Sequence, residues 1–156
     1  MLGGLSRWLR AAGYDAKFEY GIDDGVLVRT AAEHGRVVLT SDGGIFERNI
    51  VKRGIVRAIF VPRTTPPVEQ LAVVLHKLDL PVGEPRCMAC GGELVEVPKH
   101  AVRETAPPRS FAAFDRFWKC SRCEKLFWRG THWTHIRESL AGLAGRSPGR
   151  GEQAPP

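Results

Sequence analysis

Residues 36–44 read Arg-Val-Val-Leu-Thr-Ser-Asp-Gly-Gly, and this stretch decides the predicted fold. The apolar run from Val37 to Leu39 is typical of a strand that is buried on both faces of a parallel sheet. Ser41 to Gly44 is a turn signal, and a helical pattern from Ile45 to Ile50 follows it. A short apolar strand followed by a helix is the repeating unit of a parallel α/β sheet.

The same alternation continues on both sides of this stretch, with helical spacing and short apolar or alternating runs taking turns. The predicted elements are a helix up to Gly13, a strand over 16–20, a helix up to Gly35, a strand over 37–40, a helix up to Gly54, a strand over 56–61 and a helix through Leu78. Residues 1–80 are therefore predicted to form an α/β domain. Doubly wound sheets generally begin with a strand, so either a strand precedes residue 1 or the topology is helix-first.

The composition is that of an ordinary globular chain. Of 156 residues, 43% are hydrophobic and 26% are charged, which excludes a wholly disordered or fibrous protein. The net charge of +6 suits a phosphate-rich partner, although a mildly basic surface explains it equally well. No apolar run approaches the roughly 20 residues of a membrane-spanning helix. Arginines interrupt the amino-terminal apolar residues, so no export signal is predicted, and we expect a cytoplasmic protein with reduced cysteines and no membrane partner.

Two C-x-x-C pairs, Cys87 with Cys90 and Cys120 with Cys123, form the strongest local signal in the chain. Paired cysteine knuckles of this kind hold tetrahedral zinc, and four thiolates leave no open position, so the predicted Zn²⁺ is structural. A redox dithiol and a pair of disulfides are the alternatives, but a redox motif is expected singly at a strand-to-helix junction. His132 or His135 could replace a thiolate, although four cysteines are already present.

Residues 85–136 are predicted to form a separate zinc ribbon after a short linker, and residues 137–156, rich in glycine and proline, are predicted to be a disordered tail. Aromatic and basic residues interleave in the ribbon. This pattern is typical of a surface that stacks bases and binds phosphates of single-stranded nucleic acid. A module of this size also needs aromatic side chains for its own core, and the core interpretation is the more economical one. The aromatic residues concerned are Trp118, Phe127, Trp128 and Trp133.

Acidic side chains follow two of the predicted strands. Asp42 comes directly after the strand over 37–40, and Asp23 and Asp24 follow the strand over 16–20. Because ligands bind beyond the carboxyl ends of parallel strands, these carboxylates are candidates to hold Mg²⁺ or Mn²⁺, ions that activate water in phosphodiester cleavage. Each aspartate taken alone is also a good helix N-cap, and two carboxylates are few for such a site.

Several motifs in order resemble one known family, the Mut-seven C-terminal RNase domain family, across residues 1–136. They are the residues 1–10 (Met-Leu-Gly-Gly-Leu-Ser-Arg-Trp-Leu-Arg), Asp24 with Leu27 and Ala31, residues 36–42, Gln70-Leu71, residues 86–90, and residues 117–133 with Trp128, Gly130 and His132. The resemblance implies a PIN-like nuclease fold, a three-layer α/β domain with a parallel sheet, followed by a zinc ribbon. It also implies divalent-metal-dependent RNA cleavage, with Asp24 and Asp42 at the family's acidic positions.

Further residues are candidates for contacts with RNA. Arg7, Arg10 and Arg48 could position RNA phosphates, although a solvated helix face explains them as well. Trp128 and His132 are the candidate RNA contacts in the ribbon. The alternative function is a non-catalytic RNA-binding or adaptor protein in which the ribbon supplies the affinity.

The resemblance also bears on the unusual helix-first order. Family members usually carry a short strand with an aspartate just before the Met-Leu-Gly motif, and this chain begins inside that motif. A misplaced start, a truncated gene and a non-catalytic remnant are the three explanations. We favour a misplaced start and expect in-frame upstream codons to encode an apolar strand with an aspartate.

Overall fold

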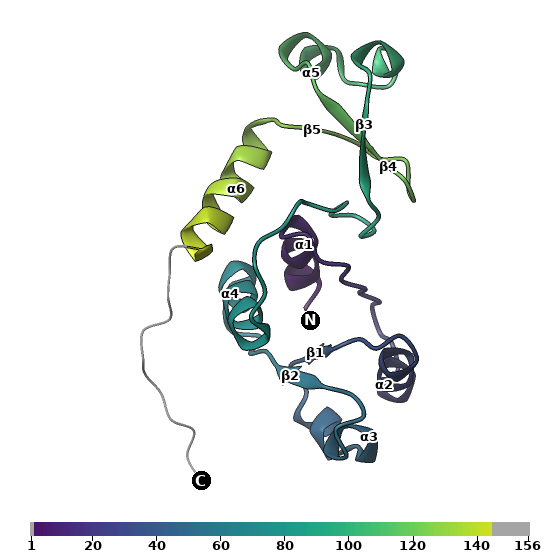
Figure 1. Cartoon of the computed structure of the whole chain (residues 1–156), viewed down its shortest axis with the longest axis vertical. Helices are drawn as coiled ribbons and strands as arrows, with labels where there is room; N and C mark the ends of the chain where they lie inside the picture. The colour runs from purple at the N-terminus through teal and green to yellow at the C-terminus, as the bar shows by residue number, and fades with distance from the viewer. Residues whose placement is uncertain (1, 145–156) are drawn as a thin grey trace.

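The computed structural model describes residues 2–144, apart from the side chains of His132 and Ala144. It contains two small sheets, which lie in different parts of the molecule (Figure 1). The first sheet is parallel and pairs β1 (Val38–Thr40) with β2 (Ala58–Phe60). The second is antiparallel, in the order β3 (Leu94–Val97), β4 (Phe117–Cys120) and β5 (Leu126–Trp128). The mixed α/β class predicted from the sequence is confirmed.

Helices surround the parallel sheet in the order expected from the sequence. They are α1 (Gly3–Ala11), α2 (Asp24–Glu33), the 3-10 helix η1 (Gly43–Glu47), α3 (Asn49–Lys52) and α4 (Pro67–Leu78). The single helix predicted up to Gly54 is divided into η1 and α3, because Arg48 adopts an extended backbone between them.

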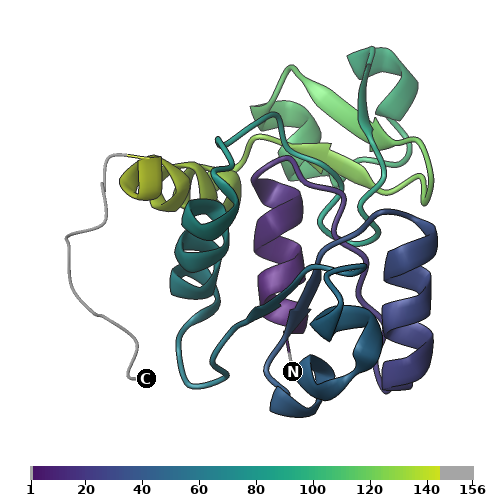
Figure 2. The same cartoon turned by 60° about the horizontal axis from the view of Figure 1, so that its bottom comes forward.

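The two faces of the parallel sheet are covered by different apolar clusters. Leu39 and Ile59 contact one cluster, which includes residues of α1 and α4, and Val38 and Ala58 contact the other, which includes residues of α2 and η1. Successive strand residues point to opposite faces, so this alternation explains why Val38 and Leu39 are both apolar, whereas Val37 is 37% exposed and belongs to neither cluster. Figure 2 shows α1 and α4 side by side and α2 apart from them.

One predicted strand is absent from the described residues. Residues 16–20 form no strand and pair with neither β1 nor β2, so the prediction of a strand there is wrong. Two of the side chains on which the prediction depended point outward, since Phe18 is 40% exposed and Tyr20 is 74% exposed. The alternating pattern in this segment therefore does not mark a buried sheet face.

The antiparallel sheet has a small core of its own. Phe117 is fully buried in a cluster that also contains Val102 and Ala106, and Phe111 and Trp128 pack against it. Between β3 and β4 the chain forms η2 (Lys99–Val102) and α5 (Pro108–Ala113), which accounts for the long spacing between the two cysteine pairs.

The carboxyl-terminal helix α6 (Thr131–Ala144) contradicts the predicted disorder of residues 137–144. Ile136 and Leu140 are buried in the same cluster as Leu5 and Leu9 of α1. Burial of one apolar stripe against another helix stabilises α6 despite the polar composition around it. Residues 145–156, the rest of the predicted tail, lie outside the described residues.

None of the helices within residues 2–144 is both long enough and apolar enough to cross a membrane.

Candidate functional site

The four cysteines come together at one point, as their spacing predicts. Their Sγ atoms all lie within 4.8 Å of one another, with Cys87 Sγ 3.6 Å from Cys123 Sγ and Cys90 Sγ 3.5 Å from Cys120 Sγ. In a tetrahedral zinc site with Zn–S bonds of about 2.3 Å, neighbouring sulfurs are about 3.8 Å apart. The arrangement therefore fits a structural metal such as zinc, and all four cysteines are free thiols rather than disulfides.

The local backbone of each cysteine pair is shaped to hold these sulfurs. The backbone N–H groups of Arg122 and Cys123 donate to Cys120 Sγ at 3.4 and 3.5 Å, and that of Gly92 donates to Cys90 Sγ at 3.4 Å. A side chain at Gly92 is excluded, because a Cβ there would lie 2.7 Å from Cys120 Sγ. The glycine at this position is a steric requirement of the metal centre.

The thiols differ in how readily they ionise. Burial raises the pKa of Cys87 to about 12, although backbone N–H groups of Cys90 and Ala89 oppose the shift. Burial also acts on Cys120, but the backbone N–H groups of Cys123 and Arg122 outweigh it and lower the pKa of that thiol to about 6. Since hydrogen bonds to the thiolate favour the charged form, Cys120 ionises more readily than Cys87.

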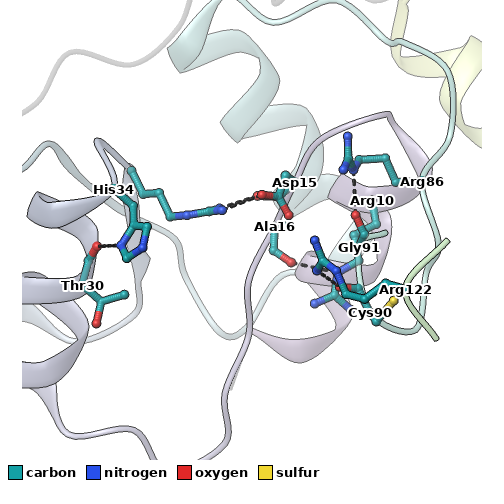
Figure 3. Close-up of polar contacts among 10 residues, drawn as sticks. Arg10, Asp15, Ala16, Thr30, His34, Arg86, Cys90, Gly91 and Arg122 are labelled. Atoms are coloured by element: carbon teal, nitrogen blue, oxygen red, sulfur yellow. Dashed lines mark hydrogen bonds and ion pairs between the residues drawn. The ribbon is translucent and has the colours of Figure 1, made fainter. Parts of the chain in front are cut away.

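Arg10 has a different role from the predicted phosphate contact. Arg10 is only 7% exposed, and its guanidinium donates to the backbone carbonyl of Ala16 at 2.8 Å (Figure 3). It also donates to the carbonyls of Met88 at 3.0 Å and Ala89 at 2.9 Å. Met88 and Ala89 are the two residues between the first cysteine pair. Arg10 thus fixes the first cysteine turn to α1, and the prediction that it lies on an RNA-binding surface is wrong.

Two further arginines hold the same turn. Arg86 Nε donates to the carbonyl of Gly91 at 2.7 Å, and Arg122 Nη1 donates to that of Cys90 at 3.0 Å (Figure 3). Sequence reasoning missed this role, because an arginine beside a cysteine pair is read as a surface cation. No local sequence pattern distinguishes an arginine that binds backbone carbonyls from one that lies on the surface, because the carbonyls come into reach only when the chain folds.

The acidic candidates lie at the carboxyl end of β1 and at the start of α2. Asp42 follows β1 and accepts from the backbone N–H of Gly44 at 2.8 Å through one oxygen, as the N-cap of η1. Asp23, rather than Asp24, is the N-cap of α2, since its Oδ1 accepts from Gly25 and Val26. Capping therefore does not explain Asp24, which is instead 3.6 Å from Arg48.

Both acidic candidates are accessible to solvent. Asp42 is exposed, and the side chains of Arg48 and Asp24 are 39% and 42% exposed. Among residues 2–144, the four cysteines are the only group of three or more metal-ligating side chains with their ligand atoms this close together. Asp24 and Asp42 therefore belong to no larger cluster of protein ligands within the described part of the chain.

The remaining candidates lie around a second feature, a cavity of about 720 Å³ between α1, residues 84–89, the antiparallel sheet and α6. We call it the aromatic cavity, because five aromatic side chains line it. Arg7 is exposed and lines it too. The His132 side chain lies outside the described residues. The aromatic residues are Trp8, Trp118, Phe127, Trp128 and Trp133.

Comparison with protein-family models matches residues 1–140 to the Mut7-C RNAse domain. The chain therefore belongs to the Mut7-C RNAse domain family, as the sequence motifs indicated, and it carries a ribonuclease-type domain whose implied substrate is RNA. The searches of curated proteins and of solved structures found no match.

Proposed function

We propose that the protein is a divalent-metal-dependent ribonuclease with a PIN-like catalytic domain and a structural zinc ribbon. The observation that supports this most is the position of Asp42, which lies two residues after the end of strand β1 and leaves one carboxylate oxygen free of its capping bond. Ligands of parallel α/β sheets bind at this end of the strands. In this proposal Asp24 and Asp42 hold Mg²⁺ or Mn²⁺, and Cys87, Cys90, Cys120 and Cys123 hold Zn²⁺.

Asp24 and Asp42 supply the number of carboxylates that such an ion requires. Mg²⁺ is commonly bound by one or two carboxylates, with water and substrate phosphates completing its coordination, so a large cluster of acidic residues is not required. When bound, the ion supplies an activated water and neutralises charge on the phosphodiester. The two aspartates orient it at the sheet edge, where the exposed position of Asp42 leaves room for a phosphate.

Arg48 is the cation of the proposed site. Its guanidinium lies 3.6 Å from the Asp24 carboxylate, and both groups remain partly solvated, so the pair is weak in the absence of substrate. A guanidinium offers five N–H donors in a fixed plane, which leaves donors for an RNA phosphate while the contact to Asp24 persists. Arg48 therefore positions the phosphate next to the carboxylates, in keeping with its predicted role.

The test is RNA cleavage by the zinc-loaded chain with and without Mn²⁺, compared with Asp42→Asn. Asparagine keeps the oxygen that accepts from Gly44, so this variant removes the charge and preserves the cap. Asp79→Asn is the matched control, because Asp79 is exposed at the end of α4 in a left-handed conformation that asparagine tolerates.

RNA binding without cleavage would favour the alternative, a non-catalytic RNA-binding or adaptor protein. One observation supports that function independently of the aspartates, namely the aromatic cavity and the basic residues that line it. Binding that weakens with salt and persists unchanged when Mn²⁺ is added is its signature.

A further inference from the structure

The aromatic cavity is separate from the acidic residues. Its volume of about 720 Å³ lies within the range of about 300–1,000 Å³ that is typical of ligand sites. The residues that line it come from α1, from residues 84–89, from the antiparallel sheet and from α6, and they do not include Asp24, Asp42 or Arg48. The cavity therefore lies between the amino-terminal part of the chain and the ribbon, and it is not part of the proposed catalytic site.

Two aromatic side chains in the cavity are not used by any apolar core of the described residues. Trp118 and Phe127 are directly opposite each other on β4 and β5, one residue along from the pair Phe117 and Trp128. Because side chains alternate across a strand, the two pairs lie on opposite faces of the sheet. Phe117 and Trp128 belong to the ribbon's core cluster, whereas Trp118 and Phe127 belong to none of the three clusters.

Three cations beside the cavity have no ion-pair partner among the described residues. Arg7, Lys125 and Arg129 are exposed, and none of them has an ion-pair partner among residues 2–144. Three other cations of the ribbon are paired with carboxylates, in Arg116–Glu96, Lys99–Asp115 and Lys119–Glu124, and the Arg116 guanidinium also lies 5.2 Å from the ring centroid of Trp118. Positive charge without an ion-pair partner is therefore present beside the aromatic rings of the cavity.

The geometry of one cation shows how charge and ring are combined. The Arg129 guanidinium lies 5.0 Å from the ring centroid of Trp118, within the range of a cation–π contact. The indole nitrogen of Trp133, another lining residue, is buried and has no hydrogen-bond partner among the described residues. The cavity therefore combines flat apolar rings with unpaired cations, which together suit a ligand that is planar and anionic.

We propose that the aromatic cavity binds unpaired bases of single-stranded RNA, which stack on Trp118 and Phe127 while Arg7, Lys125 and Arg129 contact the phosphates. The choice of RNA as the ligand rests on the proposed function, and the cavity deepens it by naming single-stranded RNA as the substrate class. Bases in a duplex are already stacked and paired, so their faces are not available to the two rings.

The test is a titration of the full zinc-loaded chain with a fluorescein-labelled oligouridylate of about 12 nucleotides, followed by fluorescence anisotropy. The buffer contains no Mg²⁺ or Mn²⁺, so that binding is measured apart from cleavage. The same strand annealed to oligoadenylate is the duplex probe, and it is expected to bind more weakly than the single strand.

The variants separate stacking from charge. Trp118→Leu and Phe127→Leu are each expected to weaken binding by about 5- to 100-fold, the range found for loss of one base–aromatic stack. Phe18→Leu is the matched control, because Phe18 is an exposed aromatic residue outside the cavity. Arg129→Gln is expected to reduce the slope of log affinity against log salt by about 0.7, whereas Arg109→Gln in α5 leaves it unchanged.

Zinc content and circular dichroism of each variant confirm that the ribbon is intact. Equal affinities of Trp118→Leu, Phe127→Leu and wild type would overturn the proposal, as would equal affinity for the single strand and the duplex. If the wild-type chain binds RNA through the cavity but does not cleave it in Mn²⁺, only the catalytic proposal is contradicted. If the wild-type chain cleaves RNA and the cavity variants bind it as tightly as wild type, only the proposal that the cavity binds RNA is contradicted.

Discussion

Replacing Arg10 by methionine tests how α1 is fastened to the first cysteine turn. The change keeps an unbranched side chain of similar length but removes the donors for the carbonyls of Ala16, Met88 and Ala89. A hydrogen bond from a charged donor contributes roughly 1.5–3 kcal/mol, and losses within one group are not fully additive. We therefore expect Arg10→Met to lower the free energy of unfolding by about 3 kcal/mol or more.

The assay is urea unfolding of the zinc-loaded chain, followed by circular dichroism. With a slope of about 1–3 kcal/mol per molar urea, this loss lowers the midpoint by about 1–3 M. The rate of zinc transfer to a chelator should rise as well, because residues 88 and 89 lie between two of the metal ligands. Arg7→Met is the control, since Arg7 is exposed on the same helix and donates no hydrogen bond within the described residues. Equal midpoints for the two variants would refute this reasoning.

Three further predictions concern the metal centre and its surroundings. Gly92→Ala is expected to weaken zinc binding by at least tenfold in chelator competition, because the new Cβ would lie 2.7 Å from Cys120 Sγ. Glu124→Gly should raise the free energy of unfolding by about 0.5–1 kcal/mol in urea titrations, since φ is 57° at this residue and glycine adopts that conformation without strain. The hydrogen bond from Arg36 lowers the pKa of Asp15. The stability from this contact is therefore complete above the ordinary pKa of an aspartate and is lost as the pH falls through the lowered pKa. Asp15→Asn should remove this contribution to the acid dependence of the unfolding midpoint.

The controls for these three variants come from the same chain. Gly142→Ala adds a methyl group where no atom lies within 4 Å, so zinc binding should be unaffected. Glu124→Gln removes the charge that contacts Lys119 but keeps the Cβ, and it should show no gain in stability. Asp115→Asn removes an aspartate whose side chain is 93% exposed and should leave the acid dependence unchanged. A loss of zinc in Gly142→Ala equal to that in Gly92→Ala would contradict the steric argument.

The elements that follow from local patterns were predicted well. The apolar run 37–39, the turn over 41–44 and the two C-x-x-C pairs each determine their structure through neighbouring residues, and the strand, the helical turn and the sulfur cluster are present as expected. The family was also predicted correctly from its sequence motifs, since the family model matches residues 1–140. Local spacing is sufficient for the strand, the turn and each cysteine pair, whereas the two pairs meet across 30 or more residues of chain.

The errors concern contacts between distant residues. Arg10 is a charged residue on an amphipathic helix, and its burial depends on carbonyls almost eighty residues away. The alternation over residues 16–20 predicted a strand, but no partner strand lies beside it among the described residues. The helix α6 could have been found, because Ile136, Leu140 and Leu143 repeat at helical spacing and all contact the α1 cluster.

The aromatic residues of the ribbon illustrate a question that the sequence leaves open. Core and ligand-binding roles were both compatible with their number and spacing, and the strand register places them on two faces of the sheet. Phe117 and Trp128 pack in the core, although Trp128 also lines the aromatic cavity, while Trp118 and Phe127 lie on the other face. Alternation along β4 and β5 could have indicated this division, although the register was needed to pair the residues.

The most direct test of the central claim is the rate of RNA cleavage by Asp42→Asn in Mn²⁺, relative to wild type and Asp79→Asn. The account predicts that wild type and Asp79→Asn cleave a single-stranded RNA only when Mn²⁺ or Mg²⁺ is added. Asp42→Asn should be slower by at least about 100-fold, since it loses a charged ligand of the activating ion. Cleavage by Asp42→Asn at the wild-type rate would contradict the assignment of the catalytic site to this edge of the sheet.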